Sequence, residues 1–128
     1  MTAEQVLLEH FGYSAFRPNQ REIIESVSAG RDTFALLPTG GGKSICYQVP
    51  AIMQEGLVLV ITPLVSLMID QVEALKVRGI NAVAIHAGMP YRQIENTLDN
   101  CAFGDVKILY CSPERLMSPT FVERLDQF

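Results

Sequence analysis

Four short apolar runs recur along the chain, and segments with helical character separate them. The runs are TFALLP (33–38), LVLVITP (57–63), NAVAIHA (81–87) and KILYCSP (107–113). Each run is nearly continuous in apolar residues, which is typical of strands that are buried on both faces. Strands that alternate with helices form β–α–β units. The sequence therefore predicts an α/β fold, a parallel sheet with flanking helices.

Helix signals occur before and between these runs. Thr2 and Gln5 have the spacing of a capping box, and Pro18 suits the first position of a second helix that ends before Gly30. Further helices are expected over 66–78 and 90–100, and from residues 43 and 118 onward. Pro50 falls inside the helix that starts at residue 43, so this helix should kink or stop there.

Composition limits the classes of function. The 128 residues suit one domain, and a hydrophobic fraction of 48% is enough for a core. The net charge of −4 offers no general basic field, so any contact with nucleic acid would be local. No apolar run approaches the roughly 20 residues of a membrane span, and the acidic N-terminus does not resemble a signal peptide. We expect no membrane contact and a cytoplasmic (bacterial nucleoid-associated) or nuclear location.

The cysteines and histidines do not suggest a metal centre. Three cysteines are an odd number, and none of them forms a C-x-x-C pair. This pattern argues against a disulfide framework and against a zinc site. The two histidines are isolated, and His86 is expected to have a structural role.

The segment PTGGGKS (38–44) ends like a phosphate-binding loop. Gly42, Lys43 and Ser44 match the end of the pattern G-x-x-x-x-G-K-[ST], whereas Leu37 stands where the first glycine belongs. A predicted buried strand precedes the loop and a predicted helix follows it. This order of strand, loop and helix is the one that a phosphate site requires.

The residue types of this loop suit a nucleotide triphosphate. The glycines would let backbone N–H groups approach phosphate beside a helix N-terminus. Lys43 would neutralise the β- and γ-phosphate oxygens, and the Ser44 hydroxyl would bind Mg²⁺, which makes both residues catalytic candidates. The candidate nucleotide-binding residues of the loop are Pro38, Thr39, Gly40, Gly41, Gly42, Lys43 and Ser44. The alternative is a glycine-rich turn that caps a helix, with Lys43 merely solvated.

Four segments, in order, resemble motifs of the RecQ family of DNA helicases in superfamily 2. FGYSAFRPNQREII (11–24) resembles the motif before the phosphate loop, PTGGGKSICYQVPA (38–51) motif I, VITPLVSLMIDQV (60–72) motif Ia, and YCSPERL (110–116) motif Ib. In superfamily 2 the first glycine of motif I is often replaced. The resemblance implies a RecA-like P-loop domain in an ATP- and Mg²⁺-dependent helicase that unwinds DNA 3′ to 5′, in repair and recombination.

The resemblance also assigns an adenine site. It implies that Tyr13 stacks on the adenine, that Arg17 packs on its other face, and that Gln20 bonds its Hoogsteen edge. A ring and a guanidinium can clamp a flat base, and a carboxamide offers the donor and acceptor that adenine N7 and N6 require. The alternatives are a core aromatic for Tyr13 and an exposed helix residue for Gln20.

DNA contacts are implied at two further motifs. Motif Ia of such motors lies along single-stranded DNA, which assigns Pro63 and Ser66 to it. Ser66, at a predicted helix N-terminus, can offer a hydroxyl and N–H groups to a phosphate; the alternative is a plain N-cap. Arg115 of SPERL is the better candidate for a phosphate contact by its charge; the alternative is that it pairs with Glu114 or another acid.

Parts of a complete motor are not found in the sequence. The chain has no Asp followed by Glu, so it lacks the D-E-x-H motif. In the RecQ family the arginine fingers and the second motor domain lie beyond the position of Phe128. We therefore expect residues 1–128 to be one partial domain, the N-terminal portion of the first RecA-like domain, with 1–30 as its leading adenine-recognition segment. The predicted strand over 33–37 should then lack flanking strands.

Three other functions compete with this one. A DEAD-box RNA helicase would show Pro-Thr-x-x-Gln before the loop and Pro-Thr-Arg-Glu-Leu in motif Ia, where this chain has FRPNQ and PLVSL. A small-molecule kinase would use Lys43 but would read adenine from a late loop. A nucleotide-binding or interaction module that never hydrolyses ATP fits the missing acids.

Overall fold

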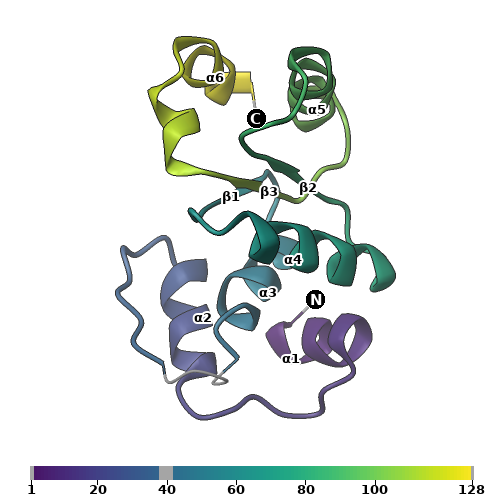
Figure 1. Ribbon diagram of the computed structural model, residues 1–128. Helices are drawn as coiled ribbons and strands as arrows, with labels where there is room; N and C mark the ends of the chain where they lie inside the picture. Colours follow the sequence, from purple (N-terminus) through teal and green to yellow (C-terminus); the bar gives the residue numbers. More distant parts are fainter. Residues whose placement is uncertain (1, 38–41, 128) are drawn as a thin grey trace. The chain divides into compact units, whose positions relative to one another are not determined.

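The computed structural model describes residues 2–37 and 42–127 (Figure 1). By its internal contacts the chain divides into two compact units, Met1–Glu55 and Gly56–Phe128. The first unit is helical and the second contains the sheet. The interpretation of 1–128 as one partial domain with a leading segment over 1–30 stays a prediction.

The first unit contains α1 (Ala3–Val6), the π-helical segment η1 (Leu7–Phe11), α2 (Gln20–Ser28) and α3 (Ile45–Met53). The capping box is confirmed, because the Gln5 N–H donates to the Thr2 hydroxyl and the Thr2 N–H donates to Gln5 Oε1. The predicted helix start at Pro18 is wrong, since α2 begins at Gln20. Asn19 between them has a left-handed backbone with φ 71°, which interrupts helical geometry.

The helix that follows the glycine loop does not stop at its proline. α3 continues past Pro50 to Met53, and the Gln54 N–H donates to the Pro50 carbonyl at 3.0 Å. Proline removes only the bond that its own N–H would have made, one turn earlier. Of the two expected outcomes at Pro50, the stop is therefore wrong and the kink stays a prediction; the buried ring of Pro50 becomes part of the packing.

The predicted strand over 33–37 is not found. Residues 31–37 have no regular secondary structure, and Phe34 and Leu36 are 94% and 85% exposed. A strand exists only when neighbouring strands pair with its backbone. No strand among the described residues pairs with this segment, so an apolar composition alone does not bury it. This agrees with the expectation that flanking strands are lacking here.

The second unit is built on a parallel sheet of β1 (Val58–Ile61), β2 (Ala82–Ile85) and β3 (Ile108–Cys111). The strand order is β1-β3-β2, and Leu59 and Val83 both pair in register with Leu109. The central strand β3 is buried at every residue, as a strand covered on both faces should be. The predicted α/β class with a parallel sheet is confirmed.

Helices cover both faces of this sheet. In Figure 1, α4 (Val65–Val77) lies on one face, and α5 (Tyr91–Phe103) and α6 (Pro119–Arg124) lie on the other. The short segments η2 (Pro113–Met117) and η3 (Leu125–Gln127) flank α6. The predicted helix starts are confirmed within one residue for all three helices. Across the described parts of the chain, no helix combines the length and the apolar character needed to cross a membrane.

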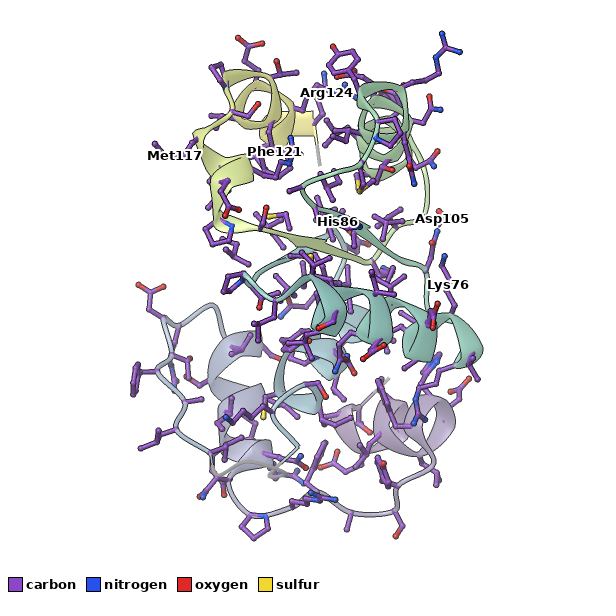
Figure 2. The ribbon with its side chains drawn as sticks, viewed as in Figure 1. Lys76, His86, Asp105, Met117, Phe121 and Arg124 are labelled. Carbon is purple, nitrogen blue, oxygen red and sulfur yellow. The ribbon has the colours of Figure 1, made fainter. Side chains whose placement is uncertain are left out.

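Phe121 anchors α6 to the sheet. Its side chain is 2% exposed and belongs to a core cluster with Leu98 of α5 and with Leu109 and Cys111 of β3 (Figure 2). The alternation of side chains along β3 sends Leu109 and Cys111 to this face. Burying a side chain of this size stabilises the fold by about 2–3 kcal/mol.

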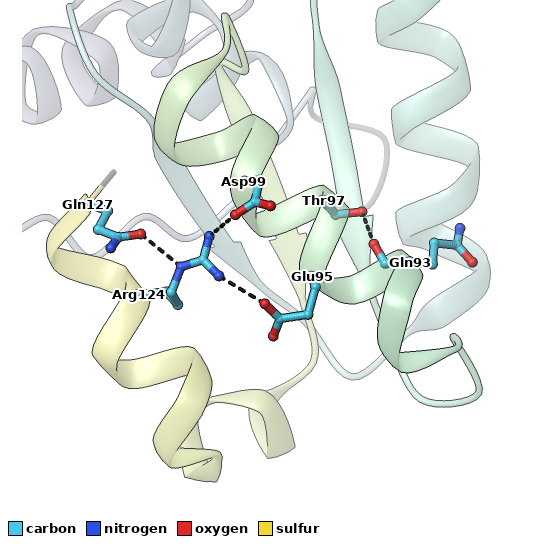
Figure 3. A network of polar contacts seen from close by, with 6 residues as sticks. All are labelled: Gln93, Glu95, Thr97, Asp99, Arg124 and Gln127. Carbon is cyan, nitrogen blue, oxygen red and sulfur yellow. Dashed lines mark hydrogen bonds and ion pairs between the residues drawn. The ribbon is translucent and has the colours of Figure 1, made fainter.

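A polar network joins α6 to α5 at the edge of this core. The Arg124 guanidinium donates to Glu95 at 3.1 Å, to Asp99, and to Gln127 at 2.8 Å (Figure 3). The Arg124 side chain is only 17% exposed, so its charge needs these acceptors. Glu95 matters more than Asp99, because the Asp99 side chain is 57% exposed and water screens it.

Replacement of Arg124 should loosen α6. Arg124→Ala removes the guanidinium that donates to three acceptors, and it should lower the free energy of unfolding by about 1–3 kcal/mol. Chemical denaturation followed by circular dichroism measures this change. Arg92→Ala, an exposed arginine on α5, is the matched control and should cost little. Equal stability of the two variants would contradict a role for the network.

The three cysteines should be unreactive in the folded chain. Burial raises the pKa of Cys46, Cys101 and Cys111, and that of Cys101 reaches about 11 although the Arg124 guanidinium lowers it. At pH 8 a thiol with that pKa is about one part in a thousand thiolate, the reactive form. A disulfide reagent should therefore titrate three thiols rapidly in denaturant and none rapidly without it. A thiol that reacts rapidly in the folded protein would contradict the burial of the three cysteines.

Candidate nucleotide site

The described end of the glycine loop leads directly into α3. Gly42 has φ 77°, a left-handed backbone that glycine adopts without strain. Lys43 is exposed, and Ser44 is the N-cap of α3 without a capping hydrogen bond from its side chain. The predicted loop residues Pro38, Thr39, Gly40 and Gly41 lie outside the described residues. The N-terminus of α3 thus presents an exposed lysine and a serine hydroxyl, which suit phosphate and metal chemistry.

Gln20 is buried beside this loop. Its side chain is 3% exposed; its Oε1 accepts from the Arg17 N–H at 2.8 Å, and its Nε2 donates to the Gly42 carbonyl at 3.0 Å. The two partners fix which end of the carboxamide is oxygen, since an N–H needs an acceptor and a carbonyl needs a donor. The alternative of an exposed helix residue is therefore wrong.

The contact with Gln20 also explains the glycine at position 42. A Cβ at this position would lie 2.3 Å from Gln20 Nε2, far inside van der Waals contact, and 3.8 Å from Arg17 Cδ. The left-handed φ is a second reason, independent of the first. The structure thus brings Arg17, Gln20 and Gly42 together.

Tyr13 is half exposed. It follows η1 and the left-handed Gly12, and 50% of its surface is accessible. The alternative of a core aromatic is therefore wrong. Stacking of Tyr13 and Arg17 on an adenine stays a prediction.

Cys46 is a residue of this site that the sequence did not single out. Its Sγ lies 3.9 Å from the Gly42 carbonyl oxygen, four residues earlier. Burial raises the pKa of this thiol, so it remains a protonated, weak donor at neutral pH. In the sequence, the one sign of this contact is that Cys46 follows Gly42 by four positions at a helix start, a spacing at which helical residues are neighbours.

A second group of candidates lies where the strands of the parallel sheet end. Pro63 and Ser66 follow β1, and Arg115 follows β3, so all three belong to the carboxyl edge of the sheet. Pro63 and Ser66 are exposed. Ser66 is inside α4, whose N-cap is Leu64, so the alternative of a plain N-cap is wrong.

Arg115 is oriented by the neighbouring strand end. Its Nη2 donates to the carbonyl of His86, directly after β2, at 3.4 Å. No ion pair joins Arg115 to an acid within the described part of the chain. The pKa of Glu114 is lowered mainly by hydrogen bonds from its own backbone and the Ser112 hydroxyl, and only weakly by Arg115. The alternative that Arg115 pairs with Glu114 is therefore wrong.

Known proteins similar to this chain are helicases. The Bacillus subtilis probable ATP-dependent DNA helicase RecS is 46% identical over 95% of the chain, and the ATP-dependent DNA helicase RecQ of the same organism is 47% identical over 97%. The chain spans 24% and 21% of these two relatives, respectively. A crystal structure of a hypothetical ATP-dependent RNA helicase from Sulfolobus tokodaii superimposes with a TM-score of 0.74 at 23% identity. That match covers 97% of this chain and 37% of the solved one, and it shows a shared RecA-like fold.

The family comparison covers most of the chain. The model of the DEAD/DEAH box helicase family matches residues 17–128, from Arg17 through the glycine loop and the whole sheet. These residues include every candidate described above except Tyr13. The chain therefore belongs to the DEAD/DEAH box helicase family.

Proposed function

We propose that this chain is the nucleotide-binding portion of a RecQ-like, ATP-dependent DNA helicase that moves along single-stranded DNA. The observation that carries the proposal is the hydrogen bond from Gln20 to the Gly42 carbonyl, which joins the candidate adenine residue to the end of the glycine segment. Five bacterial relatives named DNA helicases are 42–47% identical over at least 90% of the chain, whereas the likeness to an RNA helicase, at 23%, concerns the fold alone.

The nucleotide would be ATP with Mg²⁺. The donors at the start of α3 fit this ligand: Lys43 is exposed, and the Ser44 hydroxyl is not used to cap its own helix. Lys43 would neutralise phosphate charge, and Ser44 would hold the metal ion, which when bound offsets the charge of the β- and γ-phosphates. Tyr13 and Arg17 would clamp the base, and Gln20 would read its edge.

The DNA would lie along the carboxyl edge of the sheet. Pro63, Ser66 and Arg115 all follow strand ends there, and the His86 carbonyl orients the Arg115 guanidinium. Arginine and a helix N-terminus with a hydroxyl are common phosphate contacts. The substrate class that we propose is single-stranded DNA and its junction with duplex, unwound 3′ to 5′ in a nucleoid or a nucleus.

A second candidate function is a nucleotide-binding module without hydrolysis. It concerns residues 1–128 by themselves, which contain no Asp-Glu pair. Without such acids, no carboxylate would help Ser44 to hold Mg²⁺ or orient an attacking water toward the γ-phosphate. The two candidates share the nucleotide site and differ in turnover.

Removal of the Lys43 charge should weaken nucleotide binding. Lys43→Ala should weaken MgATP by at least about ten-fold, because the triphosphate loses a major electrostatic partner. Isothermal titration calorimetry measures this loss. Lys76→Ala, an exposed lysine on α4, is the matched control and should bind as the unmodified chain does. Equal affinities for both variants would reject the phosphate loop.

Residues 1–128 alone should not turn ATP over. The transition-state contributors that the sequence lacks commonly supply several powers of ten in rate. The assay compares this chain with a version extended through both motor domains, for nucleotide binding, DNA-stimulated hydrolysis and unwinding. We expect all three activities in the extended version and at most binding in the short one. Rapid DNA-dependent hydrolysis by the short chain would show that the catalytic acids are misassigned.

A further inference from the structure

A tight turn over residues 86–89 follows strand β2. The Met89 N–H donates to the His86 carbonyl at 3.4 Å, which closes the turn, and Gly88 at its third position has φ 90°. A positive φ at that position is what a type II turn requires, and glycine adopts it without strain. The geometry of this turn therefore sets the direction of the His86 carbonyl.

Met89 holds both polar groups of the His86 backbone. Its own N–H donates to the His86 carbonyl, and its thioether accepts from the His86 N–H, with 3.3 Å between that nitrogen and Sδ. Sulfur is a weak acceptor, and 3.4 Å is long for a hydrogen bond between an N–H and a carbonyl. Neither contact is strong alone, so the orientation of the His86 backbone depends on both of them.

The same carbonyl is the acceptor that orients Arg115. The Arg115 Nη2 donates to it at 3.4 Å, and a carbonyl oxygen has two lone pairs, one for each of its donors. Because this acceptor is neutral, it directs the guanidinium without cancelling its charge, whereas a carboxylate would compete with a phosphate. Among residues 2–37 and 42–127, no acid forms an ion pair with Arg115.

We propose that Met89 is a positioning residue of the DNA surface: it closes the turn that aims the His86 carbonyl, and through that carbonyl it holds the Arg115 guanidinium ready for a nucleic-acid phosphate. This rests on the proposed DNA contact of Arg115 and deepens it. An arginine has five N–H donors, so one can be held by the carbonyl while others serve the phosphate. A guanidinium that is ordered beforehand loses less freedom on binding, so Met89 contributes to affinity without touching the DNA.

Two substitutions weaken the turn and leave Arg115 in place. Met89→Leu keeps an apolar side chain of similar volume but removes the thioether acceptor. Gly88→Ala strains the left-handed backbone, and its Cβ would meet no heavy atom of the described residues within 4 Å. The matched controls are Met53→Leu, at a partly buried methionine of α3, and Gly79→Ala, whose φ of 79° imposes the same strain before β2 rather than after it.

The first measurement needs no DNA. NMR relaxation of the Arg115 Nε–H group in isotopically labelled protein reports how strongly the side chain is ordered. The order parameter should fall in Met89→Leu and in Gly88→Ala, and it should stay unchanged in both controls. Unchanged order in Met89→Leu would overturn the positioning role. Thermal unfolding identifies a variant that misfolds, and the other turn variant then decides.

The second measurement is a double-mutant cycle on DNA affinity. Binding of a fluorescein-labelled oligothymidylate is followed by anisotropy at several salt concentrations. Arg115→Ala should reduce the slope of log affinity against log salt by about 1, the sign of one lost phosphate contact. Met89→Leu should lower the affinity roughly two- to five-fold, the effect of one weak hydrogen bond, but should have no effect in the Arg115→Ala background. An equal loss in both backgrounds would overturn the inference.

Failure of the proposed function gives a different pattern. The order of Arg115 would fall in the turn variants as expected, but the unmodified chain would not bind oligothymidylate. That result would overturn the DNA contact of Arg115, and with it the role of Met89 in DNA binding, although the structural link between the two residues would stand.

Discussion

The buried carboxamide of Gln20 is the interaction on which the candidate nucleotide site depends. An amide that is 3% exposed must find partners inside the protein, because an unsatisfied polar group costs about 1–3 kcal/mol. Gln20 finds them in the Arg17 N–H and the Gly42 carbonyl, which join the segment before α2 to the segment before α3. Glycine suits position 42 because its φ of 77° is left-handed, and a Cβ there would in addition displace this amide.

The candidate DNA surface depends on a different constraint, the parallel pairing of β1 and β2 with the central β3. Parallel strands place all of their carboxyl ends at one edge. The segments that follow the strands therefore meet, although they are far apart in the sequence. The hydrogen bond from Arg115 to the His86 carbonyl is one such meeting, between the ends of β3 and β2. A surface for an extended polyanion needs donors from several segments along one edge, and this topology supplies them.

The sequence predicted those parts of the structure whose causes are local. The residues that determine the capping box of Thr2 lie within a few positions of one another, and so do those that determine the strand β3. The prediction of a strand over 33–37 was wrong because a strand needs neighbouring strands to pair with its backbone. A run of apolar residues does not show whether such strands are present. The burial of Gln20 was missed for the same reason. A glutamine at a helix start looks exposed, and its partner at Gly42 is visible only once the chain has folded.

The two hydrogen bonds of the Gln20 carboxamide also bear on which base the proposed site accepts. Rotating the carboxamide by half a turn would set Nε2 against the Arg17 N–H and Oε1 against the Gly42 carbonyl. Two hydrogen bonds would become two contacts between like dipoles, at a cost of at least about 2 kcal/mol. The protein thus fixes which end of Gln20 donates and which accepts. Adenine presents a donor at N6 and an acceptor at N7, whereas guanine presents two acceptors at O6 and N7. In either orientation a carboxamide turns its own oxygen toward one of the two guanine acceptors. For the adenine contact proposed here, the bonds to Arg17 and Gly42 therefore set which end of Gln20 meets N7 and which end meets N6.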